Sequence, residues 1–166
     1  MAEYAKDTQV SAEKSRGEIE RTLSRYGADS FMYGWSPEGA VIAFRCNGRH
    51  IRFVVTMPDK TDPEFTMYYR GTVNKVQVER DAATAEKLWE QATRQRWRAL
   101  ALVIKAKLEA VESGISTFEA EFMSNTMLPD GRTVAEWMEP QIEKAYEKGV
   151  MPKALQLALP AGGDAA

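Results

Sequence analysis

The side chains that serve most often as nucleophiles and general bases are scarce in this sequence. It contains one histidine, His50, and one cysteine, Cys46. For nucleophilic catalysis these two would have to meet, or His50 would have to meet a serine. They flank Asn47-Gly48, a pair typical of a two-residue hairpin turn, and the alternation of side chains along the strands sends them to opposite faces. The sequence therefore predicts no catalytic residue and favours a protein that is not an enzyme.

Metal ligands are also few. A single cysteine excludes a cysteine-rich metal site, and acidic residues gather closely only at Asp59, Asp62 and Glu64. Carboxylates in one loop can hold a divalent cation. However, their spacing matches no calcium-loop pattern, and Asp beside Pro is common in turns. We expect a turn here, and the sequence predicts no metal and no cofactor.

Cations are unevenly distributed, although the whole chain has 22 Lys and Arg against 24 Asp and Glu, for a net charge of −2. The charged residues between positions 91 and 108 are all cations, whereas residues 109–149 are rich in acids. This asymmetry suits an anionic partner, or the two parts can neutralise each other. At 3.6 residues per turn, four cations fall within about 40° of one another on one helix and form what we call the cationic line. Its members are Lys87, Arg94, Arg98 and Lys105. Such a line can follow a phosphate backbone, although solvated helix surfaces also favour Lys and Arg.

Two further cations, Arg96 and Lys107, fall inside the expected apolar arc of the same helix. A charge at such a position needs a partner, because burying it unpaired is costly. They could form a pocket for an anionic group, or extend to the edge of the helix. Of these, we favour the interpretation without a pocket, in which they extend to the edge of the helix or form an ion pair with an acid of the last predicted helix, the candidates being Glu136, Glu139 and Glu143.

Residues 40–46 and 49–55 are predicted to form a hairpin closed by a type I′ turn. The turn sets the register, so Phe44 should face Ile51 and Ile42 should face Phe53, which makes one face of the hairpin apolar. The other face should be basic, with Arg45, His50 and Arg52 on it and Arg49 at the turn.

Aromatic residues are expected beside this basic face, namely Tyr33, Trp35, Tyr68 and Tyr69. Cations mixed with aromatic side chains on a sheet are typical of proteins that bind single-stranded nucleic acid, because phosphates pair with Arg and bases stack on the rings. An ordinary solvent-exposed face with a few arginines is the alternative.

The elements that would position these residues follow from caps, breakers and periodicity. We expect a helix over residues 11–26, a strand over 31–35, the hairpin, a loop over 58–63, and Val73, Val76 and Val78 in a last strand or a mobile segment. Asp81 should begin a helix that ends near Ser113, and two capping boxes, at 116–119 and 133–136, should open two shorter helices. Pro140 should kink the last helix, and Gly149 should end it. The fold class is α+β: a small antiparallel meander of about three strands, with an N-terminal helix and a C-terminal helical half built on one long helix.

The long helix should span about 45 Å, with its core-facing arc formed by Ala85, Trp89, Ala92, Ala99, Leu100, Val103, Ile104 and Val111. One short meander cannot cover such a length, so we expect a homo-oligomer. We expect a single domain over residues 1–152 and a weakly ordered tail over 153–166. The sequence has no signal-peptide pattern and no long apolar run, so we expect a cytoplasmic protein without membrane contact.

Three runs, residues 94–100, 104–112 and 128–134, resemble a family of small, mostly uncharacterised phage and prophage proteins. Arg16, residues 26–28 and the hairpin lie in similar places. The resemblance implies an early-region protein in the cytoplasm of a bacterial host, carried with DNA replication or recombination genes, and it supplies no catalytic residue. At the level of fold alone, a three-strand meander followed by a long helix is similar to the core of single-strand annealing proteins.

These observations lead to a first functional hypothesis, a non-enzymatic phage protein that binds nucleic acid, single-stranded DNA in particular. The first alternative is a phage-encoded interaction protein that inhibits a host protein or sequesters an anionic small molecule. A metal-dependent nuclease is the third.

Overall fold

The computed structural model describes residues 8–36, 39–72 and 74–150. The elements in chain order are α1 (Ala12–Arg25), β1 (Ser30–Ser36), β2 (Gly39–Cys46), β3 (Arg49–Val55), α2 (Pro63–Thr66), β4 (Met67–Arg70), β5 (Val76–Glu79), α3 (Ala82–Glu112), α4 (Phe118–Phe122), a 3-10 turn η1 (Met123–Asn125) and α5 (Val134–Lys148). Val73 and the predicted tail over residues 153–166 lie outside the described residues.

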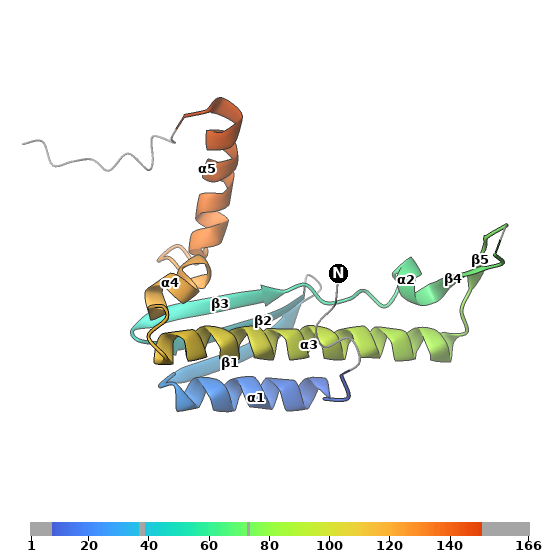
Figure 1. Ribbon diagram of the computed structural model, residues 1–166, viewed down its shortest axis with the longest axis horizontal. Helices are drawn as coiled ribbons and strands as arrows, with labels where there is room; N and C mark the ends of the chain where they lie inside the picture. The colour runs from blue at the N-terminus through green and yellow to red at the C-terminus, as the bar shows by residue number, and fades with distance from the viewer. Residues whose placement is uncertain (1–7, 37–38, 73, 151–166) are drawn as a thin grey trace, which may run out of the picture.

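The fold is α+β, as predicted. Strands β1, β2 and β3 form an antiparallel sheet in that order, and α1 and α3 lie side by side along one face of it (Figure 1). A second, two-stranded sheet of β4 and β5 lies near the N-terminal end of α3. At the other end, α5 projects away from the rest of the molecule. No described helix combines the length and the apolar character needed to cross a bilayer.

The register of the β2–β3 hairpin is the predicted one. Asn47 and Gly48 have φ angles of 50° and 70°, which a type I′ turn requires at both positions. Phe44 faces Ile51 and Ile42 faces Phe53. These four apolar side chains are buried against the helices, so the other face of the sheet carries the arginines.

The core lies between this face of the sheet and the two long helices. Ser11 caps α1 by accepting a hydrogen bond from the Lys14 N–H at 3.2 Å, and α1 buries Ile19 and Leu23. The buried side chains of α3 all lie in its C-terminal half and recur at the spacing of one helix face. They are Trp97, Leu100, Ala101, Ile104 and Leu108.

The predicted core arc of α3 is therefore partly wrong. Leu100 and Ile104 are buried, but Val103 is 46% exposed and Trp97, which the prediction omitted, is among the most deeply buried residues of α3. The arc is rotated because α1 packs beside α3 along the edge that carries Trp97. The N-terminal half of α3, before Trp97, has no buried residue.

Caps fix the remaining helix ends. Asp81 accepts from the Thr84 N–H at 2.9 Å and begins α3. Thr117, rather than the predicted Ser116, caps α4 by accepting from the Ala120 N–H at 3.2 Å. Thr133 and Glu136 form the predicted capping box of α5, which ends at Gly149 with a φ of 63°. Pro140 lies inside α5.

Candidate nucleic-acid interface

Arg45 lies on the sheet face that is turned away from α1 and α3, as predicted, but it is already paired. Its Nε donates to the Asp29 carboxylate at 2.7 Å. This hydrogen bond from Arg45 lowers the pKa of Asp29, which keeps the carboxylate charged. The pair leaves little net positive charge at this position for a phosphate.

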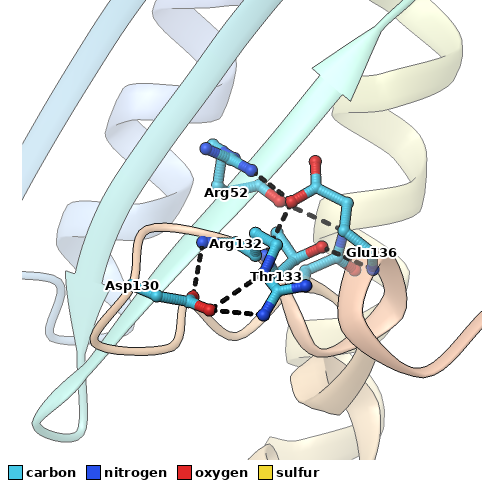
Figure 2. A network of polar contacts seen from close by, with 6 residues as sticks. Arg52, Asp130, Arg132, Thr133 and Glu136 are labelled. Atoms are coloured by element: carbon cyan, nitrogen blue, oxygen red, sulfur yellow. Dashed lines mark hydrogen bonds and ion pairs between the residues drawn. The ribbon is translucent and has the colours of Figure 1, made fainter.

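Arg52 is paired as well, and Figure 2 shows the network around it. Its guanidinium donates to the Glu136 carboxylate, and that carboxylate also accepts from the Thr133 N–H at 2.7 Å. The Thr133 hydrogen bond, followed by the charge of Arg52, lowers the pKa of Glu136. The side-chain amide of Asn125 donates to the Arg52 carbonyl at 3.2 Å. Arg52 therefore connects β3 to the start of α5.

The hairpin retains two exposed predicted residues, Arg49 and His50. Within the described part of the chain, neither forms a salt bridge. The His50 carbonyl accepts from the Met127 N–H at 2.8 Å. Cys46 is buried on the opposite face, where burial raises the pKa of its thiol. Cys46 and His50 thus do not form a nucleophile–base pair.

The aromatic residues of β1 are not where the prediction placed them. Tyr33 faces Ile42 across the strands and Trp35 faces Ala40, so both rings lie on the helix side of the sheet. The ring of Tyr33 meets that of Trp97 edge to face, with centroids 5.4 Å apart. The predicted mixed surface of arginines and aromatics is therefore divided between the two faces.

The cationic line of α3 is half neutralised. Arg98 pairs with Glu18 of α1, and Arg94 donates to the Gln91 side chain at 2.7 Å and lies 3.6 Å from Glu90. The two outer members of the line, Lys87 and Lys105, are exposed. Neither forms an ion pair with any residue in the described ranges.

Arg96 and Lys107 do not form one pocket, since they are separated by about 16 Å along α3. Arg96 is exposed and lines a cavity that α3 shares with α2 and the preceding loop. Lys107 donates to the Glu121 carbonyl at 2.6 Å and lies 3.4 Å from its carboxylate. The ion pair that we favoured from the sequence exists for Lys107, but its partner belongs to α4 rather than to α5.

Aromatic and cationic side chains converge elsewhere, in a cavity of about 560 Å³ at the end of the sheet, which we call the aromatic cleft. It lies among the start of α1, the end of β1, the loop after β3 and the middle of α3. Four aromatic rings line it, those of Tyr33, Trp35, Trp89 and Trp97. The Trp35 side chain is 79% exposed, so it offers a free ring face to solvent.

Two cations hold the rings of the aromatic cleft. The Arg16 guanidinium lies 4.7 Å from the ring centroid of Tyr33 and 5.5 Å from that of Trp97, and it donates to the Tyr33 hydroxyl at 2.9 Å. Lys60 Nζ lies 5.5 Å from the Trp89 ring centroid. Such contacts fix ring orientation, since a cation prefers the ring face.

The polar side chains of the aromatic cleft are covered or already paired. The Thr93 hydroxyl oxygen is buried and has no hydrogen-bond partner among the described residues. Arg16 also bonds Glu13 at 3.3 Å, and Lys60 bonds Glu86 at 2.8 Å, so both cations carry acidic partners. In the sequence, the spacing of Trp89, Thr93 and Trp97 by four residues was the signal for this cleft, but such spacing is equally typical of a core stripe.

The acidic loop has a structural role. Asp59 accepts from the Thr61 N–H at 2.8 Å and from the Thr61 hydroxyl at 2.7 Å, and the Thr61 backbone contributes most to the lowered pKa of Asp59. Among the residues that the structure describes, no three His, Cys, Asp or Glu side chains converge as metal ligands.

Comparisons of the chain with protein-family models, with curated proteins and with solved structures found no match. The assignment of this interface therefore depends on its geometry.

Proposed function

We propose that this protein binds single-stranded nucleic acid, DNA in particular, by stacking a base in the aromatic cleft. The observation that supports this proposal is the convergence of Tyr33, Trp35, Trp89 and Trp97 in one cavity of about 560 Å³. Unpaired bases expose flat aromatic faces, and they stack on such rings with little regard to sequence. A duplex hides these faces, so the cleft favours single strands.

Trp35 would contribute most to stacking, because its ring is largely exposed and lies on the edge strand β1. Stacking of one base on an aromatic ring contributes about 1–3 kcal/mol. The ring of Tyr33 is held by Arg16, so it would lose little conformational freedom on binding, and the buried ring of Trp97 supports it edge to face.

Phosphates would be bound by the exposed cations that lack an ion pair with a described residue, chiefly Lys87 and Lys105 of α3 and Arg49 of the hairpin. These replace the originally predicted contacts at Arg45, Arg52, Arg94 and Arg98, which have acidic or amide partners. In keeping with the resemblance to phage proteins, we propose that such binding acts in replication or recombination.

A second candidate function is the sequestration of a single anionic nucleotide. The volume of the aromatic cleft lies within the range of about 300–1,000 Å³ that small-molecule sites occupy. This candidate needs the same stacking rings but no extended line of phosphate contacts.

Both candidates can be tested by titrating tryptophan fluorescence with a 20-nucleotide thymidine oligomer and with thymidine monophosphate. For a single-strand binder, the oligomer quenches the fluorescence and the mononucleotide competes weakly. Trp35→Ala should weaken binding of the oligomer about 5- to 100-fold. Tyr69→Ala is the matched control, because Tyr69 is an exposed aromatic of β4 outside the aromatic cleft. Equal affinity of the parent and of a folded Trp35→Ala variant for both ligands would refute the proposal.

A further inference from the structure

The start of α5 forms one wall of a second cavity, which we call the α5 groove. It has a volume of about 760 Å³, and α4, η1 and the end of α3 form the rest of its lining. Most of its surface is apolar, contributed by Ala120, Met123, Val134, Ala135, Met138 and Ile142. The elements that line it, α4, η1 and the start of α5, lie at the end of the molecule opposite to β4 and β5 (Figure 1).

The apolar face of α5 is only partly covered by the described residues, since Val134, Ala135 and Met138 are half-buried. No residue of α5 is buried, Ile142 is 44% exposed and Met123, which also lines the groove, is 56% exposed. A projecting amphipathic helix normally buries its apolar stripe against another element. The exposed groove therefore has the character of an interaction surface.

The walls of the α5 groove are fixed before any partner arrives. The Arg52–Glu136 ion pair and the Thr133 capping box hold the start of α5 to β3. On the other side, Lys107 bonds the Glu121 carbonyl and so ties α4 to α3. A partner would therefore meet a preformed surface and would lose little affinity to ordering of the groove.

The rim of the α5 groove is acidic. Its charged residues are Lys107, Glu121, Glu139 and Glu143. Lys107 and Glu121 neutralise each other at 3.4 Å, whereas Glu139 and Glu143 have no ion pair with a described residue. An occupant that brings cations beside its apolar side chains would therefore be favoured.

We infer that the α5 groove is the docking site for a basic amphipathic helix of a partner protein. The apolar floor would accept residues spaced by three and four along that helix, and Glu139 and Glu143 would pair with its Lys or Arg. Met123 and Met138 suit this role, because flexible thioether side chains adapt to different partners. The inference is independent of nucleic-acid binding, since the aromatic cleft contains none of these residues.

Charge argues against the two occupants that the chain itself could supply. Residues 151–166 contain one cation, Lys153, and one acid, Asp164, so they bring no excess of positive charge. The α5 helix of a second copy would bring Glu139 and Glu143 against the same two acids, which is repulsive. A separate basic partner fits the rim better than either.

The test uses a fluorescein-labelled synthetic peptide of 14 leucines and lysines with helical amphipathic spacing, titrated against the full chain by anisotropy. Binding is expected, and the Leu–Glu peptide of the same pattern should not bind. Ile142→Glu should weaken binding about tenfold or more, and so should the double variant Glu139→Lys with Glu143→Lys. Glu79→Lys is the control, because Glu79 is exposed in β5, at the end of the molecule opposite to α5, and this variant should leave binding unchanged.

Absence of peptide binding, or an equal loss with Glu79→Lys, would overturn the inference. A tenfold gain in peptide affinity after removal of residues 151–166 would instead identify the chain's own end as the occupant and would also overturn it. A dimer that Ile142→Glu converts to a monomer in light scattering would also overturn the inference, because the occupant of the groove would then be a second copy of the chain. Circular dichroism of each variant establishes that it is folded.

Discussion

Arg52 and Glu136 lie 84 residues apart in the sequence and form an ion pair. The pair joins the outward face of the sheet to the first turn of the projecting helix α5. Glu136 simultaneously completes the capping box with Thr133, so one carboxylate caps the start of α5 and anchors it to β3. A residue predicted as a nucleic-acid contact is therefore part of the attachment of α5.

Removing this pair should loosen α5 more than it affects the sheet. We expect Arg52→Ala to lower the free energy of unfolding by about 0.5–1 kcal/mol, because the partners are partly exposed and solvent screens them. Urea denaturation of the two single variants Arg52→Ala and Glu136→Ala and of the double variant gives the interaction energy. Arg49→Ala, an exposed arginine at the turn, should change stability by less. Strict additivity of Arg52→Ala and Glu136→Ala would show that the pair contributes nothing.

The stability contribution of Glu136 should depend on pH. Its pKa in the folded chain is lowered from the ordinary value of 4.5, so the folded state favours the charged carboxylate. This contribution is fully present above pH 4.5 and is lost as the pH falls through the lowered pKa. We expect Glu136→Gln to be less stable than the parent at neutral pH, and the difference in stability to shrink as the pH falls below 4.5 and through the lowered pKa. A stability difference that persists unchanged at low pH would contradict the assignment.

The sequence was sufficient for features set by local chemistry. The Asn47-Gly48 turn fixes the hairpin register, because only a few turn conformations match the twist of the strands. The caps Ser11, Asp81 and Thr133 were also recognised, since a capping side chain bonds a backbone N–H only two or three residues away. All four features involve contacts within a few residues.

Features that depend on distant contacts could not be read in the same way. Tyr33 and Trp35 lie on the helix side because of the register in which β1 pairs with β2. The sequence between these two strands does not predict that register. The partner of Arg52 is 84 residues away, and any acid of the last helix could have served. The buried face of α3 includes Trp97 because of the side on which α1 packs against it. Periodicity alone does not specify that side.

The revised core of α3 can be tested with two neighbouring residues. Leu100 is buried and Val103 is 46% exposed. Leu100→Ala should lower the free energy of unfolding by about 2–5 kcal/mol, as truncation of buried leucines does. Val103→Ala should change it by less than about 0.5 kcal/mol, because an exposed side chain leaves no cavity. Thermal and urea unfolding of both variants measure these changes. A comparable loss of unfolding free energy in both variants would mean that Val103 is covered, for example in an oligomer.

Gly39 should not tolerate a side chain. Its φ is +144°, and a Cβ at this position would lie 2.4 Å from the Val55 carbonyl oxygen of β3. We expect Gly39→Ala to destabilise the protein by more than about 1 kcal/mol, because the backbone would have to shift where β2 begins. Gly34→Ala is the control, because a Cβ there would meet no atom within 4 Å. A melting temperature of Gly39→Ala equal to that of Gly34→Ala would contradict the close approach of the two strands.

The salt dependence of binding separates contacts to phosphate from stacking. Each phosphate contact on a single strand contributes about 0.7 to the slope of log K against log salt. Lys87→Ala with Lys105→Ala should therefore reduce the slope for the thymidine oligomer by about 1.4. Trp35→Ala should lower the affinity and leave the slope unchanged. Lys144→Ala with Lys148→Ala removes the same charge from α5 and should leave the slope unchanged. An equal reduction of the slope in both double lysine variants would mean that binding depends on the overall charge of the protein and that the nucleic acid does not follow α3.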